Sequence, residues 1–306
     1  MALTHVFAGN PLDRADAKRR DPEWLAAAYR DPRSRVLPMW QLNVLIDSSA
    51  GARLGWLDAP RAAALQVDEP PIFLGIVDGI AHFALDISSI GDPAHELDLG
   101  GTLEFKDSRT AAMLLPIPDT GVLAQSRSQL DWHRRHRFCG ACGNPTVPNR
   151  GGHVRECAVC KSEHFPRTDP VAIMLISDGE RCLLGQSAGR LARSGFYSAL
   201  AGFIDQGESI EEAVRREVFE EAGVRVGDVR YHSSQPWPFP SSLMIGCHGA
   251  ALSTDISIDQ SEMADVRWFS RDDALRAVEG TNPNLKVPGG MAIAHHLIKA
   301  WATGDV

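Results

Sequence analysis

The sequence predicts an α+β protein in which two sheet-containing domains flank a small cysteine-rich module. The chain has 306 residues, which suits one large or two medium domains, and 44% of them are hydrophobic. Short apolar runs separated by Gly, Pro and Asp occur before residue 118 and again after residue 169. Two close pairs of cysteines lie between these regions. Together these observations indicate two cores and a metal-binding insertion.

The N-terminal domain is expected to span residues 1–118. From about residue 36 to residue 117 the sequence contains the strand-like runs RVLPMWQLNVLI, ARLGWL, PIFLGIV and IAHFALDI. Residues 1–30 are charged and mixed, with little periodicity. We therefore expect a compact mixed sheet.

A linker helix and the cysteine module form the expected middle domain, residues 119–168. The segment DTGVLAQSRSQLDWHRRHRF has a helical pattern, for which Asp119 or Thr120 is the expected cap. The residues expected to be buried on this helix include Leu123, Leu130 and Trp132.

The C-terminal domain is expected to span residues 169–306. The runs DPVAIMLIS, CLLGQS and FYSALAGF have the pattern of strands, and further strands are expected as far as Phe269. Helices are expected at about 210–221 and 290–302.

The charge and the apolar segments of the chain indicate which partners and which cellular location to expect. The net charge of −8 argues against general nucleic-acid affinity, which needs many basic groups. The sequence contains no run of about 18 apolar residues and no secretory signal pattern, so we expect a cytoplasmic protein.

Four of the six cysteines form two C-x2-C pairs, Cys139 with Cys142 and Cys157 with Cys160. Each pair can direct two thiolates at one ion, and four thiolates complete a tetrahedral zinc site without an open position. The spacing predicts one structural Zn²⁺, in preference to iron or to two unrelated thiol pairs. The nearby histidines, expected to be surface or packing residues, are His153 and His164.

The segment GFIDQGESIEEAVRREVFEEAGV, residues 202–224, predicts a helix with defined ends. Ser209 and Glu212 form a capping box at its start. Gly223 is the type of residue that adopts the left-handed conformation after a helix.

Three glutamates, Glu217, Glu220 and Glu221, crowd one face of this helix because they are three and four residues apart. A solvated acidic face is the simplest alternative. Like charges at this spacing destabilise a helix, so helix stability alone does not favour them. Clustered carboxylate oxygens suit Mg²⁺ or Mn²⁺, which are usually shared with substrate phosphates.

Gly202, Glu208 and the run REVFEEAGV at 216–224 match the Nudix box at every defined position. The chain therefore resembles the Nudix hydrolases, which cleave nucleoside diphosphates linked to another group. The resemblance implies an α/β/α sandwich, and it implies that Arg216 pairs with Glu208 to brace the loop. The residues that it implies as ligands of the catalytic metal are Glu217, Glu220, Glu221, Glu262 and the backbone carbonyl of Ala201.

The stretch SQPWPFPSS, residues 234–242, follows the box by ten residues. Its prolines rule out a helix and a central strand, because each lacks a backbone N–H. We expect a stiff, extended loop that displays Trp237 and Phe239. Flat rings of this kind suit the stacking of a nucleotide base.

Within the Nudix hydrolases, this loop and the four cysteines resemble the NADH pyrophosphatase group, which includes NAD-capped RNA hydrolases. That resemblance implies a zinc ribbon, a preceding Nudix-like α/β domain and a homodimer. The residues that it implies as substrate contacts are Phe165, Phe203, Gln235, Pro236, Trp237, Pro238, Phe239, Pro240, Ser241, Ser242 and Ala294.

The resulting hypothesis is metal-dependent hydrolysis of the diphosphate bond of NADH or NAD⁺, or of the NAD cap of an RNA. Free dinucleotide would give AMP and the nicotinamide mononucleotide, with Glu217 or Glu221 as the base. One alternative is a Nudix hydrolase for another diphosphate, such as ADP-ribose. The other is a non-catalytic, zinc-ribbon nucleic-acid-binding regulator, for which the basic run HRRHR at 133–137 gives some support.

Overall fold

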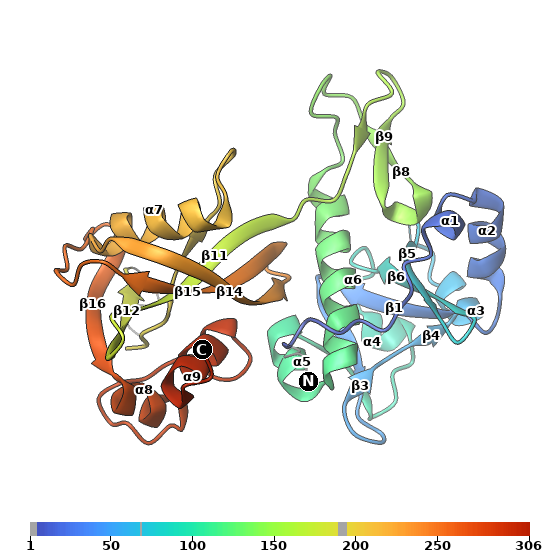
Figure 1. Cartoon of the computed structure of the whole chain (residues 1–306). Helices are drawn as coiled ribbons and strands as arrows, with labels where there is room; N and C mark the ends of the chain where they lie inside the picture. The colour runs from blue at the N-terminus through green and yellow to red at the C-terminus, as the bar shows by residue number, and fades with distance from the viewer. Residues whose placement is uncertain (1–4, 68, 189–194) are drawn as a thin grey trace. The chain divides into compact units, whose positions relative to one another are not determined.

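The computed structural model describes residues 5–67, 69–188 and 195–306, and it divides into two compact units (Figure 1). The N-terminal unit comprises Val6–Thr168 together with the short segment Trp237–Ser241. The C-terminal unit comprises Asp169–Pro236 and Ser242–Val306, and it also includes His5. No helix among the described residues is long and apolar enough to cross a membrane.

The N-terminal unit is built on a mixed sheet with the strand order β3-β2-β1-β6-β5, in which β4 adds to β1 and β7 adds to β2. Its strands are β1 (Arg35–Trp40), β2 (Asn43–Asp47), β3 (Arg53–Leu54), β4 (Leu57–Asp58), β5 (Ile72–Val77), β6 (Ile80–Asp86) and β7 (Leu103–Lys106). Its helices are α1 (Asp16–Arg19), α2 (Pro22–Arg30), α3 (Ala59–Ala63), α4 (Pro93–Glu96), α5 (Ser108–Leu114) and α6 (Ile117–Arg135). The expected mixed sheet is present, with short helices that the sequence pattern did not predict.

Helix α6 begins two residues before the first expected cap, at Ile117, with Pro116 as its N-cap residue. The prediction of Asp119 or Thr120 as the cap was therefore wrong. Pro118 fits the first helical turn because the N–H that it lacks would have no partner there. The predicted buried residues are confirmed, with relative exposures of 0% for Leu123, 3% for Leu130 and 5% for Trp132.

The cysteine module is a small antiparallel sheet with the order β10-β9-β8. Its elements are β8 (Thr146–Asn149), the 3-10 turn η1 (Arg150–Gly152), β9 (Val154–Cys157) and β10 (Glu163–His164). Strands β8 and β9 form an antiparallel pair, which places Thr146 opposite Cys157.

The C-terminal unit is built on a sheet with the order β14-β15-β11-β12-β16, and β13 pairs with β11. Its strands are β11 (Asp169–Ser177), β12 (Arg181–Ser187), β13 (Leu200–Phe203), β14 (Val226–Trp237), β15 (Ser242–Ala251) and β16 (Met263–Ser270). Its helices are α7 (Ile210–Ala222), α8 (Arg271–Val278) and α9 (Ile293–Thr303). The last helix starts three residues later than expected, and α8 was not predicted.

The central strand β11 is apolar on both faces because each face is covered by helices (Figure 1). Met174 packs toward α7 beside Val214 and Val218. Leu175, the next residue, packs on the opposite side beside Leu297 of α9. This alternation follows from the two-residue period of a strand. It produces the expected α/β/α sandwich.

Strand β14 is an edge strand of this sheet and runs through Trp237. The first part of the expected proline loop is therefore the end of an edge strand, where Pro236 can be accommodated without losing a ladder donor.

A buried histidine makes the stability of the N-terminal unit depend on pH. His133 Nε2 lies 2.7 Å from the carbonyl oxygen of Gly152, and its Nδ1 lies 2.9 Å from Arg155 Nη1. A carbonyl only accepts and a guanidinium only donates, so this ring is neutral, with its proton on Nε2. Burial is the main cause that lowers the pKa of His133 to about 4, and the charge of Arg155 contributes.

We predict that the free energy of unfolding falls as the pH decreases from 6.5 toward 4, because the unfolded chain then binds the extra proton. The slope for one such group is about 1.4 kcal/mol per pH unit. His133→Gln retains one donor and one acceptor but does not titrate. Urea unfolding at pH 6.5 and pH 5 should show wild type losing about 1.5 kcal/mol more than the variant, since the unfolded histidine is already half protonated at pH 6.5. Equal losses in the two proteins would contradict the assignment.

Candidate functional site

Helix α7 carries the predicted acidic residues, and its two ends are fixed as the sequence indicated. Ser209 accepts a hydrogen bond from the Glu212 amide at 3.2 Å, and the Glu212 carboxylate accepts one from the Ser209 amide at 2.7 Å. Gly223 follows the helix with a φ of 70°, in the left-handed region. The predicted capping box and C-terminal glycine are therefore confirmed.

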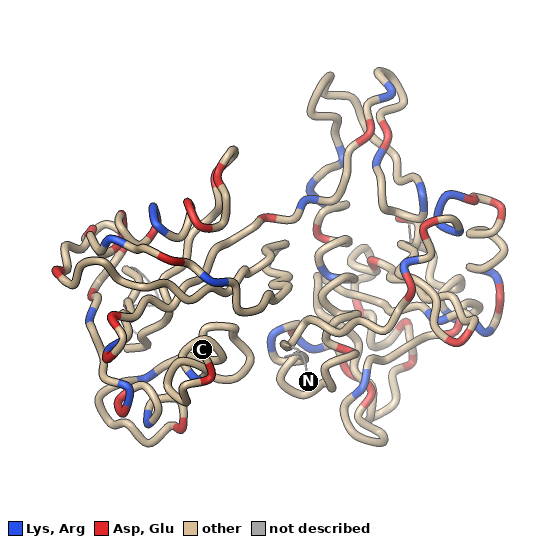
Figure 2. Tube along the Cα trace, in the orientation of Figure 1, with Lys and Arg blue, Asp and Glu red and all other residues tan. Residues whose placement is uncertain are grey.

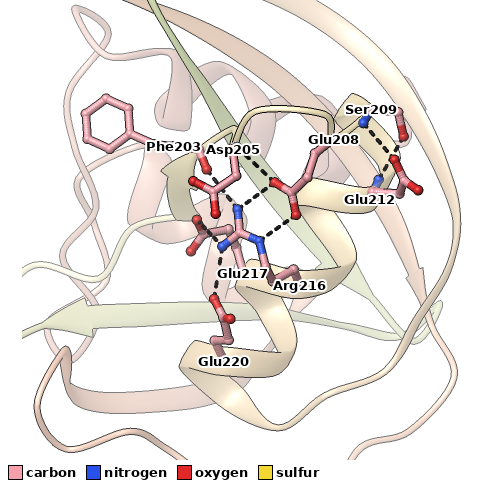
Figure 3. A network of polar contacts seen from close by, with 8 residues as sticks. All are labelled: Phe203, Asp205, Glu208, Ser209, Glu212, Arg216, Glu217 and Glu220. Carbon is pink, nitrogen blue, oxygen red and sulfur yellow. Dashed lines mark hydrogen bonds and ion pairs between the residues drawn. The ribbon is translucent and has the colours of Figure 1, made fainter.

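Arg216 is the centre of a polar network that joins α7 to the loop before it (Figure 3). Its Nε and Nη2 donate to the two carboxylate oxygens of Glu208, at 2.6 and 2.8 Å. Nη2 also donates to the carbonyl oxygen of Phe203 at 2.9 Å. The expected pair of Arg216 and Glu208 is thus present, and it is bidentate, the strong geometry for an arginine–carboxylate pair.

The same guanidinium contacts two of the three clustered glutamates. Arg216 Nη1 lies 2.9 Å from Glu217 Oε1 and 3.0 Å from Glu220 Oε2. Both carboxylates are therefore held close to a positive charge. These contacts offset the mutual repulsion that their spacing on the helix creates.

Gly202 on β13 is packed directly against Glu217. A Cβ atom at this position would lie 1.9 Å from the carboxyl carbon of Glu217, which is far inside van der Waals contact. Strand β13 pairs with β11, with Gly202 opposite Ala172, so the backbone has little freedom to move away. A glycine is required here because the carboxylate lies against the strand backbone.

Glu221 is the most unusual acid of the site. Its side chain is 8% exposed, and its Oε2 atom is buried without a hydrogen-bond partner among the described residues. Burial is the main cause that raises its pKa to about 8, and the charges of Glu217, Glu262 and Glu220 add to the effect. The backbone N–H of Ala201 donates to the carboxylate and opposes this rise. A buried, unsatisfied oxygen among other carboxylates is a position that a divalent cation would satisfy.

The predicted metal ligands differ in their exposure to solvent and in the charged groups near them. Burial is the main cause that raises the pKa of Glu217, and the charge of Glu262 adds to this effect, as it does for Glu221. The side chain of Glu220 is 53% exposed and turns toward Arg216. The four cysteines are the only group of described residues whose ligand atoms all lie within 4.8 Å of one another. The carboxylates therefore offer hard oxygen donors, but they do not form a closed shell as they stand.

Two predicted substrate-contacting rings are free on the surface of their own units. Phe165 is 60% exposed in the N-terminal unit, and Phe203 is 59% exposed in the C-terminal unit. Single exposed aromatic rings also occur elsewhere on this chain, as at Phe138 and Phe219, so exposure shows only that both rings have free surface. Ala294 is only 2% exposed at the start of α9.

The side chain of Gln235 is fully buried. Its Nε2 donates to the carbonyl oxygen of Met291 at 2.7 Å, and its Oε1 accepts from the amide of Ile293 at 2.8 Å. These two bonds tie β14 to the start of α9. Gln235 thereby fixes the backbone next to Ala294.

The rings of Trp237 and Phe239 contact each other and the N-terminal segment of the chain. Phe7 lies with its ring centroid 5.8 Å from Trp237 and 5.7 Å from Phe239. The guanidinium groups of Arg109 and Arg127 lie 3.9 and 4.5 Å from the centroid of Phe239. No local sequence pattern predicts these contacts, because the partners are more than 100 residues away from the loop.

The four cysteine sulfurs of the cysteine module lie close together. Cys139 and Cys142 lie 3.5 and 3.4 Å from Cys160, and Cys142 lies 3.5 Å from Cys157. His164 Nε2 lies 3.2 Å from the sulfur of Cys139, where an imidazole N–H can support a thiolate from outside the tetrad. This donor set fits a closed, tetrahedral zinc site.

The basic run at 133–137 is largely neutralised. Asp131 forms ion pairs with Arg134 at 3.1 Å and Arg135 at 2.8 Å, and Arg137 pairs with Glu69 at 3.2 Å. His133 is buried and neutral. Basic and acidic residues are interspersed along the traces of both units (Figure 2). This pattern weakens the argument for a dedicated nucleic-acid surface at this run.

Comparisons with known proteins cover most of the chain. The family model for the NUDIX domain matches residues 166–287, and the NADH pyrophosphatase zinc ribbon domain matches residues 134–165. The NADH pyrophosphatase-like rudimentary NUDIX domain matches residues 33–132. The resemblance seen in the sequence is therefore confirmed, as is the predicted fold class.

Three curated relatives illustrate the likeness. The NAD-capped RNA hydrolase NUDT12 of Macaca fascicularis is 37% identical, over 97% of this chain and 73% of its own. The NAD-capped RNA hydrolase NudC of Mycobacterium bovis is 35% identical, over 95% of this chain and 92% of its own. The mitochondrial NAD(P)H pyrophosphatase NUDT13 of Homo sapiens is 39% identical, over 72% of this chain and 68% of its own.

We predict that one Zn²⁺ per chain is bound by the four cysteines and that it is structural. Cys157→Ser should lose zinc and lower the melting temperature, because a metal that holds this small module together contributes to folding. Elemental analysis of freshly purified, unchelated protein measures the zinc. Less than about half an equivalent in the wild-type chain would contradict the prediction.

Proposed function

The chain belongs to the Nudix hydrolases that carry an NADH pyrophosphatase zinc ribbon, and we propose that it hydrolyses the diphosphate bond of NAD-type dinucleotides. The products from NADH or NAD⁺ would be AMP and the reduced or oxidised nicotinamide mononucleotide. Two of the relatives are NAD-capped RNA hydrolases and the third is an NAD(P)H pyrophosphatase, which supports two substrates, the NAD cap of an RNA and the free dinucleotide. We propose both for this chain.

The observation that carries the proposal is the acidic face of α7, where Glu221 is buried with an unpaired oxygen beside Glu217. Mg²⁺ or Mn²⁺ is the proposed ion, because hard cations of this size take carboxylate and carbonyl oxygens and share substrate phosphates. When bound, such an ion neutralises phosphate oxygens and lowers the pKa of a coordinated water. The residues proposed to hold it are Glu217, Glu220, Glu221, Glu262 and the carbonyl group of Ala201.

The remaining roles concern proton transfer and positioning. Glu217 or Glu221 would accept the proton of the attacking water. Arg216 and Glu208 would keep the loop before α7 in place through their bidentate pair. Gly202 would leave space for the Glu217 carboxylate directly against the backbone of β13.

Substrate contacts are proposed for the exposed rings and for the proline-rich segment. Phe165 and Phe203 have ring surface available for stacking on a base or on nicotinamide. The other residues proposed to contact the dinucleotide are those of the proline-rich segment and the backbone of Ala294. The residues of the segment are Gln235, Pro236, Trp237, Pro238, Phe239, Pro240, Ser241 and Ser242.

We further propose three domains, residues 1–118, 119–168 and 169–306, as the family resemblance implies. The resemblance also implies a cytoplasmic homodimer, which we propose for this chain. Light scattering on the purified chain measures its oligomeric state. A particle mass of one chain at micromolar concentration would reject the homodimer.

Comparative kinetics test the proposed function. We predict that kcat/KM with Mg²⁺ or Mn²⁺ is higher for NADH, NAD⁺ or NAD-capped RNA than for ADP-ribose. The control variant Glu221→Gln keeps the side-chain shape but removes the charge, so its rate should fall about 10²–10⁴-fold. A preference for ADP-ribose would favour the alternative hydrolase. Wild-type protein without metal-dependent turnover of any of these substrates would favour the non-catalytic regulator.

A further inference from the structure

We propose that Phe7 is a positioning residue that sets the affinity for the dinucleotide, because it closes a three-ring cluster with Trp237 and Phe239. This inference rests on the proposed function, in which the segment Trp237–Ser241 contacts the substrate. Phe7 itself lies far from this segment in the sequence but belongs to the same compact unit.

The three rings contact one another pairwise. The centroid distances are 5.8 Å for Phe7 and Trp237, 5.7 Å for Phe7 and Phe239, and 5.5 Å for Trp237 and Phe239. All three pairs are edge-to-face, the arrangement that aromatic pairs prefer. Phe7 is 1% exposed, so it is the buried member of the cluster. The two loop rings are therefore packed on a fixed support.

Phe7 is held in an unusual backbone conformation. Its φ of 72° lies in the left-handed region, which is uncommon for a bulky residue. Its amide donates to Thr120 Oγ1 at 2.8 Å, and Thr120 Oγ1 donates to the carbonyl oxygen of Ile117 at 2.7 Å. These bonds anchor Phe7 to the first turn of α6. A strained residue persists where its surroundings fix it, which often marks a functional position.

Helix α6 also holds the backbone of the proline-rich segment. The Arg127 guanidinium donates to the carbonyl oxygen of Pro238 and lies against the ring of Phe239. Ser128 Oγ donates to the carbonyl oxygen of Pro240 at 3.0 Å. Prolines lack backbone N–H groups, so this segment has few donors of its own to pair with its carbonyls. Arg127 and Ser128 of α6 provide these donors, whereas Phe7 packs against the two aromatic side chains.

Removal of the Phe7 ring should free the side chains of Trp237 and Phe239 in the unbound protein. Binding would then have to order two more side chains, which weakens affinity without altering the acidic residues of α7. We therefore expect KM to rise by about tenfold while kcat changes little.

The test compares Phe7→Leu with Phe73→Leu, a matched control in the same unit. Phe73 is also fully buried, and it packs against Trp24 and Phe83, away from the loop. Phe7→Leu should raise the KM for NADH about tenfold, whereas Phe73→Leu should lower the melting temperature at unchanged KM. Ser128→Ala, which removes one hydrogen bond to the loop, should raise KM by a smaller factor.

Wild-type KM in Phe7→Leu, or equal rises in both Phe→Leu variants, would overturn the inference. Equilibrium binding of NADH, followed by its fluorescence without added Mg²⁺ or Mn²⁺, separates this inference from the proposed function. Weaker binding in Phe7→Leu alone supports the role of Phe7 even where no turnover occurs. Unchanged binding in Phe7→Leu rejects that role, whatever the turnover result.

Discussion

The bidentate ion pair between Arg216 and Glu208 is the interaction on which the rest of the site depends. It joins the first part of the box to the middle of α7 through two bonds of 2.6 and 2.8 Å. The same guanidinium reaches the carbonyl group of Phe203 at the end of β13. One side chain therefore sets the position of the strand, the loop and the helix together. A lysine could not replace it, because an ammonium group lacks the planar set of donors.

The site also depends on compensation of the electrostatic repulsion among the clustered glutamates of α7. Arg216 compensates Glu217 and Glu220, whereas Glu221 has no such partner and responds to burial with a pKa of about 8. The acidic face is thus a strained arrangement in the protein alone, and a divalent cation would relieve it. Gly202 allows this crowding because it lets the Glu217 carboxylate lie against the strand backbone.

Local features of the site could be predicted from the sequence, and the reason is physical. The capping box and Gly223 determine the ends of α7 through contacts within a few residues. The continuous apolar run of β11 indicates that both of its faces are covered. The two cysteine pairs have a spacing that admits few arrangements other than a shared metal.

Features that depend on distant contacts could not be predicted. The partners of Trp237 and Phe239 come from the start of the chain and from α6, and no local pattern identifies them. The role of Thr120 was misjudged for the same reason: it lies inside the first turn of α6, where its hydroxyl accepts from the amide of Phe7 and donates to the carbonyl oxygen of Ile117. The basic run at 133–137 gave some support for a nucleic-acid-binding surface. In the structure, two of its arginines pair with Asp131, which precedes them on the same helix.

The most direct test of this account is an EPR titration of Mn²⁺ binding to the wild-type chain and to Arg216→Lys. The account predicts that the variant keeps its zinc and remains folded but binds Mn²⁺ about tenfold or more weakly, as expected when an outer support of metal ligands is lost. Equal Mn²⁺ affinity in the two proteins would contradict it, because the carboxylates would then not need Arg216 to be placed for metal binding.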